Sequence, residues 1–303
     1  TDAGNVTGLA LLNGFPNPTP PPYAPGRFSN GPVWSDLFAA RLGVPAAAGP
    51  AWLNAGSNYA VGGATTGTSG ILGTPTGMLS QGALFASQHP GGVPANGLFV
   101  LWGGGNDIIN AVSLPTPGAQ LQAVQQAVTN LAMLAGGLFS NFGATNFLIP
   151  SLPDVGIAPL YAADPTSAAI ATNLTTAFNQ LLGVSIMQLD ALPGVNAFGL
   201  NLNNLLTNIR IDAAQGGPRY GITNTTIPCF TLPNPATGCN SALFVDGRHP
   251  TTLASALIAD AAYNRVVLNT DVAAVPEPAT VALVAVGLLF TAVASRRRRT
   301  LGG

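Results

Sequence analysis

Apolar residues recur at intervals of three and four over two long stretches of the chain, 118–141 and 166–191. This spacing gathers them on one side of a helix, so we expect two long amphipathic helices. The same spacing over 33–42 and 251–268 predicts two shorter helices, and Gly43 is expected to end the first of them. Helical periodicity is therefore the strongest structural signal in the sequence.

Short apolar runs between these stretches predict strands. Residues 98–102 form a continuous apolar run bounded by glycines, which is typical of a strand buried on both faces of a parallel sheet, and TNFLIP at 145–150 predicts the next strand. Residues 58–66 predict the end of a short strand that runs into a glycine loop, whereas 67–97 and 192–245 are rich in turn residues. The alternation of strands and helices predicts an α/β domain with three layers around a parallel sheet.

The composition of the 303 residues restricts the possible partners. Hydrophobic residues make up 47% and charged residues 7%, whereas soluble domains carry about 25% charged residues. Four of the ten basic residues are Arg296 to Arg299, and without them six Arg stand against eleven acidic residues, a net charge of −5. We therefore expect no nucleic-acid partner.

The two cysteines, Cys229 and Cys239, lie close together in the segment CFTLPNPATGC. A short loop between turn residues favours a disulfide, which would contribute about 2–3 kcal/mol. Free thiols are the alternative. Because no further Cys or His accompanies the pair, a metal site is not expected.

Asp246 and His249 are the first candidates for catalysis. An Asp that orients a His, and a His that moves a proton, are two parts of a nucleophilic hydrolase site. The alternative is an Asp that caps the helix after Pro250 beside a surface His. The other histidine, His89, precedes a proline and is expected in a surface turn.

Two further glycine-rich turns carry groups suited to binding an oxyanion. Asn106 follows the predicted strand 98–102, and ligands of open α/β sheets bind beyond the carboxyl ends of the strands. Its amide could stabilise a developing oxyanion, or Asn106 and Asp107 could simply form a turn and cap a helix. Gly62 and Gly63 form the other turn, where backbone N–H groups can approach a ligand.

In order along the chain, these segments resemble the blocks of the GDSL, or SGNH, hydrolase family in its lipase and esterase branch. NYAVGGATT is similar to the second block, Gly104-Gly105-Asn106-Asp107 to the third, and Asp246-Gly247-Arg248-His249-Pro250 to the last. The resemblance covers about residues 1 to 270 and implies a three-layer, flavodoxin-like sandwich. It also implies that His249 is the general base, that Asp246 orients it, and that Gly63 and Asn106 bind the oxyanion. Gly62 is the neighbour with which Gly63 could be confused.

The sequence departs from the family at the first block, which usually reads G-D-S-L-(S or T)-D-x-G-N. The chain opens with TDAGN, which matches only the end of this block. We therefore expect the nucleophilic serine two positions before Thr1, with the first strand also missing and the chain as written inactive. Ser29 is the first serine present, but it does not occupy the nucleophile position of the family.

The resemblance implies a serine ester hydrolase without a cofactor that acts on lipid, acyl or acetylated glycan esters. An acetyl esterase of exopolysaccharide is one alternative. A matrix or adhesion protein that keeps the fold without catalysis is the other.

The C-terminal segment predicts export from the cell. Val275-Pro276-Glu277-Pro278 is followed by sixteen uncharged, mostly apolar residues at 279–294 and, after Ser295, by the Arg cluster. An ordinary membrane anchor has this pattern, but the order also resembles the PEP-CTERM sorting signal, which implies an exosortase-type processing enzyme. We expect a hydrolase domain over 1–271, a linker over 272–278 and a transmembrane helix with the Arg cluster over 279–303. The expected location is extracellular or on the outer surface of a Gram-negative bacterium, after transient anchoring in the inner membrane.

Overall fold

A parallel sheet of three strands forms the centre of the fold. The structure is a computed structural model, and it describes residues 1–52, 56–94 and 96–273. The strands lie in the order β1 (Leu98–Val100), β2 (Asn146–Pro150) and β3 (Asn196–Leu200). Helices α4 (Gly105–Val112) and α5 (Pro117–Phe142) connect β1 to β2. Because β1 pairs with β2 and β2 with β3 in parallel, the carboxyl ends of the three strands meet at one edge of the sheet.

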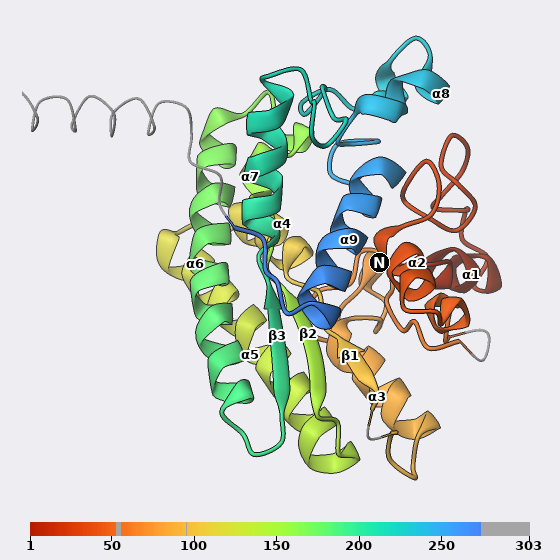
Figure 1. The fold of residues 1–303 in the computed structure, drawn as a ribbon, viewed down its shortest axis with the longest axis vertical. Coiled ribbons are helices and arrows are strands. Elements are labelled where there is room, and N and C mark those ends of the chain that lie inside the picture. Colours follow the sequence, from red (N-terminus) through yellow and green to blue (C-terminus); the bar gives the residue numbers. More distant parts are fainter. Residues whose placement is uncertain (53–55, 95, 274–303) are drawn as a thin grey trace, which may run out of the picture.

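Helices cover both faces of this sheet (Figure 1). Helices α4, α5 and α6 (Pro165–Asp190) pack on one face, and α2 (Trp34–Arg41), α7 (Leu202–Ala213) and α9 (Thr252–Val267) pack on the other. Strand β2 joins the two cores, because successive side chains of a strand point to opposite faces. Phe147 and Ile149 belong to the core beneath α5 and α6, whereas Leu148 belongs to the core beneath α7 and α9. The predicted three-layer α/β class is confirmed.

The four predicted helices form, and side-chain caps explain where three of them begin. Thr116 accepts a hydrogen bond from the Ala119 N–H, and Pro117 fills the first position of α5. Asp164 caps α6 in the same way, through the Ser167 N–H. Thr251 caps α9 by accepting from the Ala254 N–H.

The strand end predicted at 58–66 is wrong, although the glycine turn predicted after it forms. Asn58 makes an isolated bridge to Pro50, and a turn follows. The carbonyl groups of Asn58 and Ala60 accept hydrogen bonds from the Asn5 side-chain amide. The Asn58 carbonyl also accepts the Ala51 N–H, and the backbone pairing with the Pro50 segment goes no further among the described residues.

Several elements form where the sequence predicted only loops. Strand β3 and helix α7 lie in the turn-rich stretch 192–245, together with the short helix α8 (Pro235–Gly238). Helices α1 (Asn5–Leu12) and α3 (Met78–Gln88) are also additional. Short 3₁₀ segments complete the chain: Pro45–Ala48, Ile71–Gly73, Val155–Ile157, Pro159–Tyr161, Cys229–Thr231 and Cys239–Ser241.

Candidate active site

Asp246 and His249 form a hydrogen-bonded pair in the tight loop that precedes α9. Nδ1 of His249 lies 2.7 Å from Oδ2 of Asp246. The other carboxylate oxygen, Oδ1, accepts the backbone N–H groups of Arg248 and His249, each at 2.8 Å. The Asp therefore shapes the loop with one oxygen and orients the imidazole with the other. The side chain of His249 remains 34% exposed.

Asp246 is held in its ionised form. Burial alone would raise the pKa of Asp246, but the hydrogen bond from His249 and the charge of the imidazolium lower it. Further hydrogen bonds from the Tyr23 hydroxyl and the Arg248 N–H contribute, and the pKa of Asp246 ends well below its ordinary value. An ionised Asp facing Nδ1 is the state that holds the imidazole in one tautomer and stabilises its cation.

A loop from the N-terminal part of the chain packs on this pair. The Phe28 ring stacks on the His249 ring with centroids 4.8 Å apart and 17° between the planes. Oγ of the buried Ser29 donates to the Pro250 carbonyl at 2.9 Å, and the Asn30 side chain accepts the Thr252 N–H. No pattern in the sequence predicts these contacts, because more than 200 residues separate the partners.

The turn that carries Gly62 and Gly63 is fixed by backbone hydrogen bonds. The Ala64 N–H donates to the Val61 carbonyl, and Gly63 has a φ of +78°, which favours glycine at this turn position. The Gly62 N–H donates to Oδ2 of Asp2 at 2.7 Å. The Gly63 N–H, in contrast, has no hydrogen-bond acceptor within the described parts of the chain, and Gly63 is exposed.

Asn106 stands in the first turn of α4, beyond the carboxyl end of β1. Its Nδ2 donates to the Ala64 carbonyl at 2.8 Å, which ties the amide to the glycine turn. The neighbouring Asp107 accepts hydrogen bonds from the Thr66 N–H and hydroxyl. Burial raises the pKa of Asp107, although these hydrogen bonds oppose the rise. Asp107 therefore links Thr66, which follows the glycine turn, to the start of α4 beside Asn106.

A chain of contacts joins the four residues predicted for the site. Asn106 bonds to Ala64 in the turn of Gly63, and Phe28 lies between that turn and the His249 ring. A methyl group added at Gly62 would come within 2.4 Å of the Phe28 ring. The glycine at this position therefore allows the turn and the acid–base pair to approach each other.

The sequence model of the GDSL-like lipase/acylhydrolase family matches residues 1–262. The chain belongs to this family. A second model, the PEP-CTERM protein-sorting motif, matches residues 274–299. Both resemblances stated from the sequence are thereby confirmed.

Relatives of this GDSL protein include named esterases. It is 28% identical to Esterase EstA of Pseudomonas aeruginosa, over 88% of the chain and 46% of the esterase. It is 25% identical to the thermolabile hemolysin of Vibrio parahaemolyticus, over 86% of the chain and 60% of the hemolysin. A GDSL esterase/lipase of Arabidopsis thaliana is 27% identical, over 84% of the chain and 77% of the plant protein. The chain thus spans about half the length of the bacterial relatives named here.

In this GDSL protein the segment TDAGN has a structural role, which Asp2 and Asn5 perform through their hydrogen bonds. The Asp2 carboxylate accepts the N–H groups of Gly4, Asn5 and Val6 at the start of α1, besides that of Gly62. The buried Asn5 side chain reaches the backbone of Trp52, Asn58 and Ala60. Both residues therefore hold the glycine turn, a role that the sequence did not reveal.

The nucleophile expected before Thr1 lies outside residues 1–303. Among the described residues, none is hydrogen bonded to Nε2 of His249. Ser29 is buried, and its hydroxyl is bonded to the Pro250 carbonyl. His89 lies apart from the pair, where its ring stacks on Phe85 at the end of α3.

A disulfide joins Cys229 and Cys239. The backbone N–H groups of Cys229 and Phe230 donate to the carbonyls of Phe244 and Val245, directly before Asp246. The cystine loop is thereby attached to the segment that carries the acid–base pair. No group of three or more His, Cys, Asp or Glu side chains that could hold a metal occurs among the described residues.

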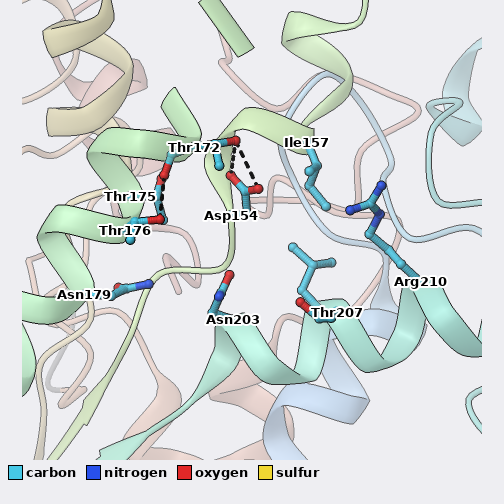
Figure 2. A pocket seen from close by; sticks show the side chains of 10 residues that line it. Asp154, Ile157, Thr172, Thr175, Thr176, Asn179, Asn203, Thr207 and Arg210 are labelled. Atoms are coloured by element: carbon cyan, nitrogen blue, oxygen red, sulfur yellow. Dashed lines mark hydrogen bonds between the residues drawn. The ribbon is translucent and has the colours of Figure 1, made fainter. Parts of the chain in front are cut away.

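The molecule also has a polar cavity of about 130 Å³ between α6 and α7 (Figure 2). Its polar lining includes Asp154, Thr172, Asn179, Asn203, Thr207 and Arg210. Hydrogen bonds from Thr172 and the Gly156 N–H already engage Asp154. Because none of the residues predicted for the active site lines this cavity, it is separate from that site.

The predicted transmembrane helix and most of the predicted linker fall within residues 274–303, outside the described residues. Among the helices of residues 1–52, 56–94 and 96–273, none is long and apolar enough to cross a membrane.

Proposed function

We propose that the chain is the catalytic domain of an exported serine ester hydrolase. The observation that carries this proposal is the Asp246–His249 hydrogen bond of 2.7 Å, in a member of the GDSL-like lipase/acylhydrolase family. The sorting motif at 274–299 supports export to the surface of a Gram-negative bacterium through an exosortase-type enzyme. We further propose that the hydrolase domain ends at about residue 271 and that the sorting segment follows it.

The proposed reaction takes the nucleophile to be the serine of the family's first block, two positions before Thr1. His249 accepts the proton from the serine hydroxyl at Nε2 while the serine oxygen bonds to the ester carbonyl carbon. Asp246 stabilises the imidazolium that results. The proton then passes to the leaving alcohol as the acyl-enzyme forms. A water molecule repeats the sequence, which releases the acid and regenerates the serine.

The oxyanion is assigned to the backbone N–H of Gly63 and the side-chain amide of Asn106. Gly63 is favoured over Gly62 because Asp2 already accepts the Gly62 N–H, whereas the Gly63 N–H is free within the described residues. Asn106 retains a second amide hydrogen after bonding to Ala64. A donor of this kind contributes about 3–4 kcal/mol to the stabilisation of the transition state.

Hydrolysis of short-chain p-nitrophenyl esters by protein expressed from the complete gene tests the proposal. We expect turnover by the unmodified protein and a loss of about a millionfold in kcat for His249→Ala, the scale seen when a hydrolase triad loses its base. His89→Ala is the matched control and should retain full activity. Undiminished turnover by His249→Ala would refute the mechanism. No turnover by the unmodified protein would favour a non-catalytic role.

A further inference from the structure

Tyr23 is bonded to the acid–base pair although 223 residues separate it from Asp246. Its hydroxyl donates to Oδ2 of Asp246 at 2.5 Å. This is the same oxygen that faces Nδ1 of His249 at 2.7 Å. Oδ1 is occupied by the two backbone N–H groups of the loop, so the carboxylate is held from both of its oxygens.

Aromatic packing fixes the position of the Tyr23 ring. Phe28 contacts the ring edge to face, with centroids 5.8 Å apart, and Phe230 does the same at 5.1 Å. Phe28 also stacks on His249, and Phe230 follows Cys229 of the disulfide. The Tyr23 loop is itself closed by a hydrogen bond from the Ala24 N–H to the Ser29 carbonyl. The hydroxyl therefore reaches Asp246 from a prearranged direction.

We propose that Tyr23 is a positioning residue for the acid–base pair, which it serves by fixing the Asp246 carboxylate and sharing its negative charge. The inference rests on the proposed function, since it concerns the same proton transfer. Without the hydroxyl, rotation of the carboxylate about its last bond is limited by the backbone bonds to Oδ1 and by the single bond between Oδ2 and His249. With it, Oδ2 has a fixed direction and points at Nδ1 of His249.

The Tyr23 hydroxyl stays protonated and remains a donor through neutral pH. Burial raises the pKa of Tyr23, and the hydrogen bond to Asp246 and the charge of that carboxylate raise it further. Arg248 opposes the rise through its positive charge. The titratable and charged groups around the Asp246 carboxylate are thus Tyr23, His249 and Arg248.

Kinetics of Tyr23→Phe test the proposal, because the substitution removes the hydroxyl and keeps the ring between Phe28 and Phe230. We expect kcat to fall about tenfold, because loss of one hydrogen bond to a charged group raises the activation barrier by an amount of this order. KM should change less than about twofold. The acid limb of the pH–rate profile should move to higher pH, because a carboxylate that loses a donor stabilises the imidazolium more strongly. A merely structural role would leave that limb in place.

Tyr59→Phe is the matched control, since the Tyr59 hydroxyl donates to Gln88 Oε1 at 2.5 Å, in an exposed contact between other segments. It should leave kcat and the acid limb unchanged. In an Asp246→Ala background the Tyr23 hydroxyl has lost its acceptor, so Tyr23→Phe should cause no further loss. A tenfold loss in that background as well would overturn the proposal, because the effect would not pass through Asp246.

Proton NMR supplies a readout that does not need turnover. The chain has two histidines, so the Nδ1–H signal of His249 can be assigned by comparison with His249→Ala. We expect Tyr23→Phe to shift and broaden this signal, and Tyr59→Phe to leave it unchanged. If Tyr23→Phe matched the unmodified protein in kcat, acid limb and this signal, the proposal would be overturned. If the unmodified protein hydrolysed no ester while the signal still responded, the proposed function alone would fail.

Discussion

The two sides of the candidate site are held by different means. On the acid–base side, Asp246 and His249 contact side chains of a distant loop, among them Tyr23 and Phe28. On the oxyanion side, backbone N–H groups in and beside the turn of Gly63 donate to a carbonyl of the turn and to the carboxylates of Asp2 and Asp107. The difference follows from what each side has to present to a substrate.

A proton-transfer group must hold one side-chain rotamer, and contacts from other side chains restrict a rotamer best. A backbone N–H needs only a rigid turn, which hydrogen bonds from the turn's own N–H groups and a positive φ at glycine supply. In both cases a carboxylate is central. Asp246 accepts an imidazole and a phenol, whereas Asp2 accepts four backbone N–H groups. We expect the effects of substitutions on the two sides to differ in magnitude and in pH dependence.

The largest effect is expected for Asp246→Asn. Loss of the charge that orients His249 should lower kcat about ten-thousandfold, as replacement of the equivalent Asp does in a serine protease triad. Steady-state kinetics with p-nitrophenyl esters measure this loss. Asp164→Asn is the control, because Asn can still cap α6 from this exposed position. A loss below tenfold for Asp246→Asn would mean that the imidazole is oriented by other groups.

The same substitution should change stability with a defined sign. The pKa of Asp246 is lowered in the folded protein, so its ionised form stabilises the fold above its ordinary pKa of about 4. That contribution is lost as the pH falls below this value. The difference in free energy of unfolding between the unmodified protein and Asp246→Asn should therefore shrink from pH 6 to pH 3. Urea unfolding at each pH measures it, and a difference that grows toward acid would contradict the assignment.

On the oxyanion side, Asn106→Ala should lower kcat about 10²- to 10³-fold with little change in KM, because the amide acts on the transition state. Asn110→Ala is the matched control, since Asn110 is exposed one turn later on α4. Kinetics on the same esters compare the two variants. Equal activities would remove Asn106 from the site and leave Gly63 as the assigned donor.

The smallest effect on catalysis is expected for removal of the disulfide by Cys229→Ser with Cys239→Ser. The free energy of unfolding should fall by about 2–3 kcal/mol, because the unfolded chain regains the entropy of the closed loop. The acid–base side should also loosen, since Phe230 beside the disulfide packs on Tyr23. We expect a loss in kcat of less than about tenfold for this reason. Urea unfolding and kinetics measure the two changes, and an unaltered kcat would show that Phe230 holds Tyr23 without the disulfide.

Much of the fold could be predicted where the periodicity of apolar residues was strong. Helices α5 and α6 were predicted because their apolar residues recur at intervals of three and four over seven turns. Strand β3 was missed because Asn and Gly weaken the sequence NAFGL as a strand, and pairing with β2 supplies its order. The strand end predicted at 58–66 did not form: Asn58 makes only an isolated bridge to Pro50, and the Asn5 side chain also binds the carbonyls of Asn58 and Ala60.

For the site, the sequence by itself determined the order and the chemistry of the blocks: a glycine pair, Asn106, and an Asp three residues before a His. A spacing of three brings Asp246 and His249 together locally, so a linear pattern is sufficient to predict that pair. Only the tertiary structure decided which glycine N–H is free and that Tyr23 shares the carboxylate of Asp246. Those facts depend on contacts between segments 60 and 223 residues apart, and a sequence encodes such contacts only through the packing of the whole domain.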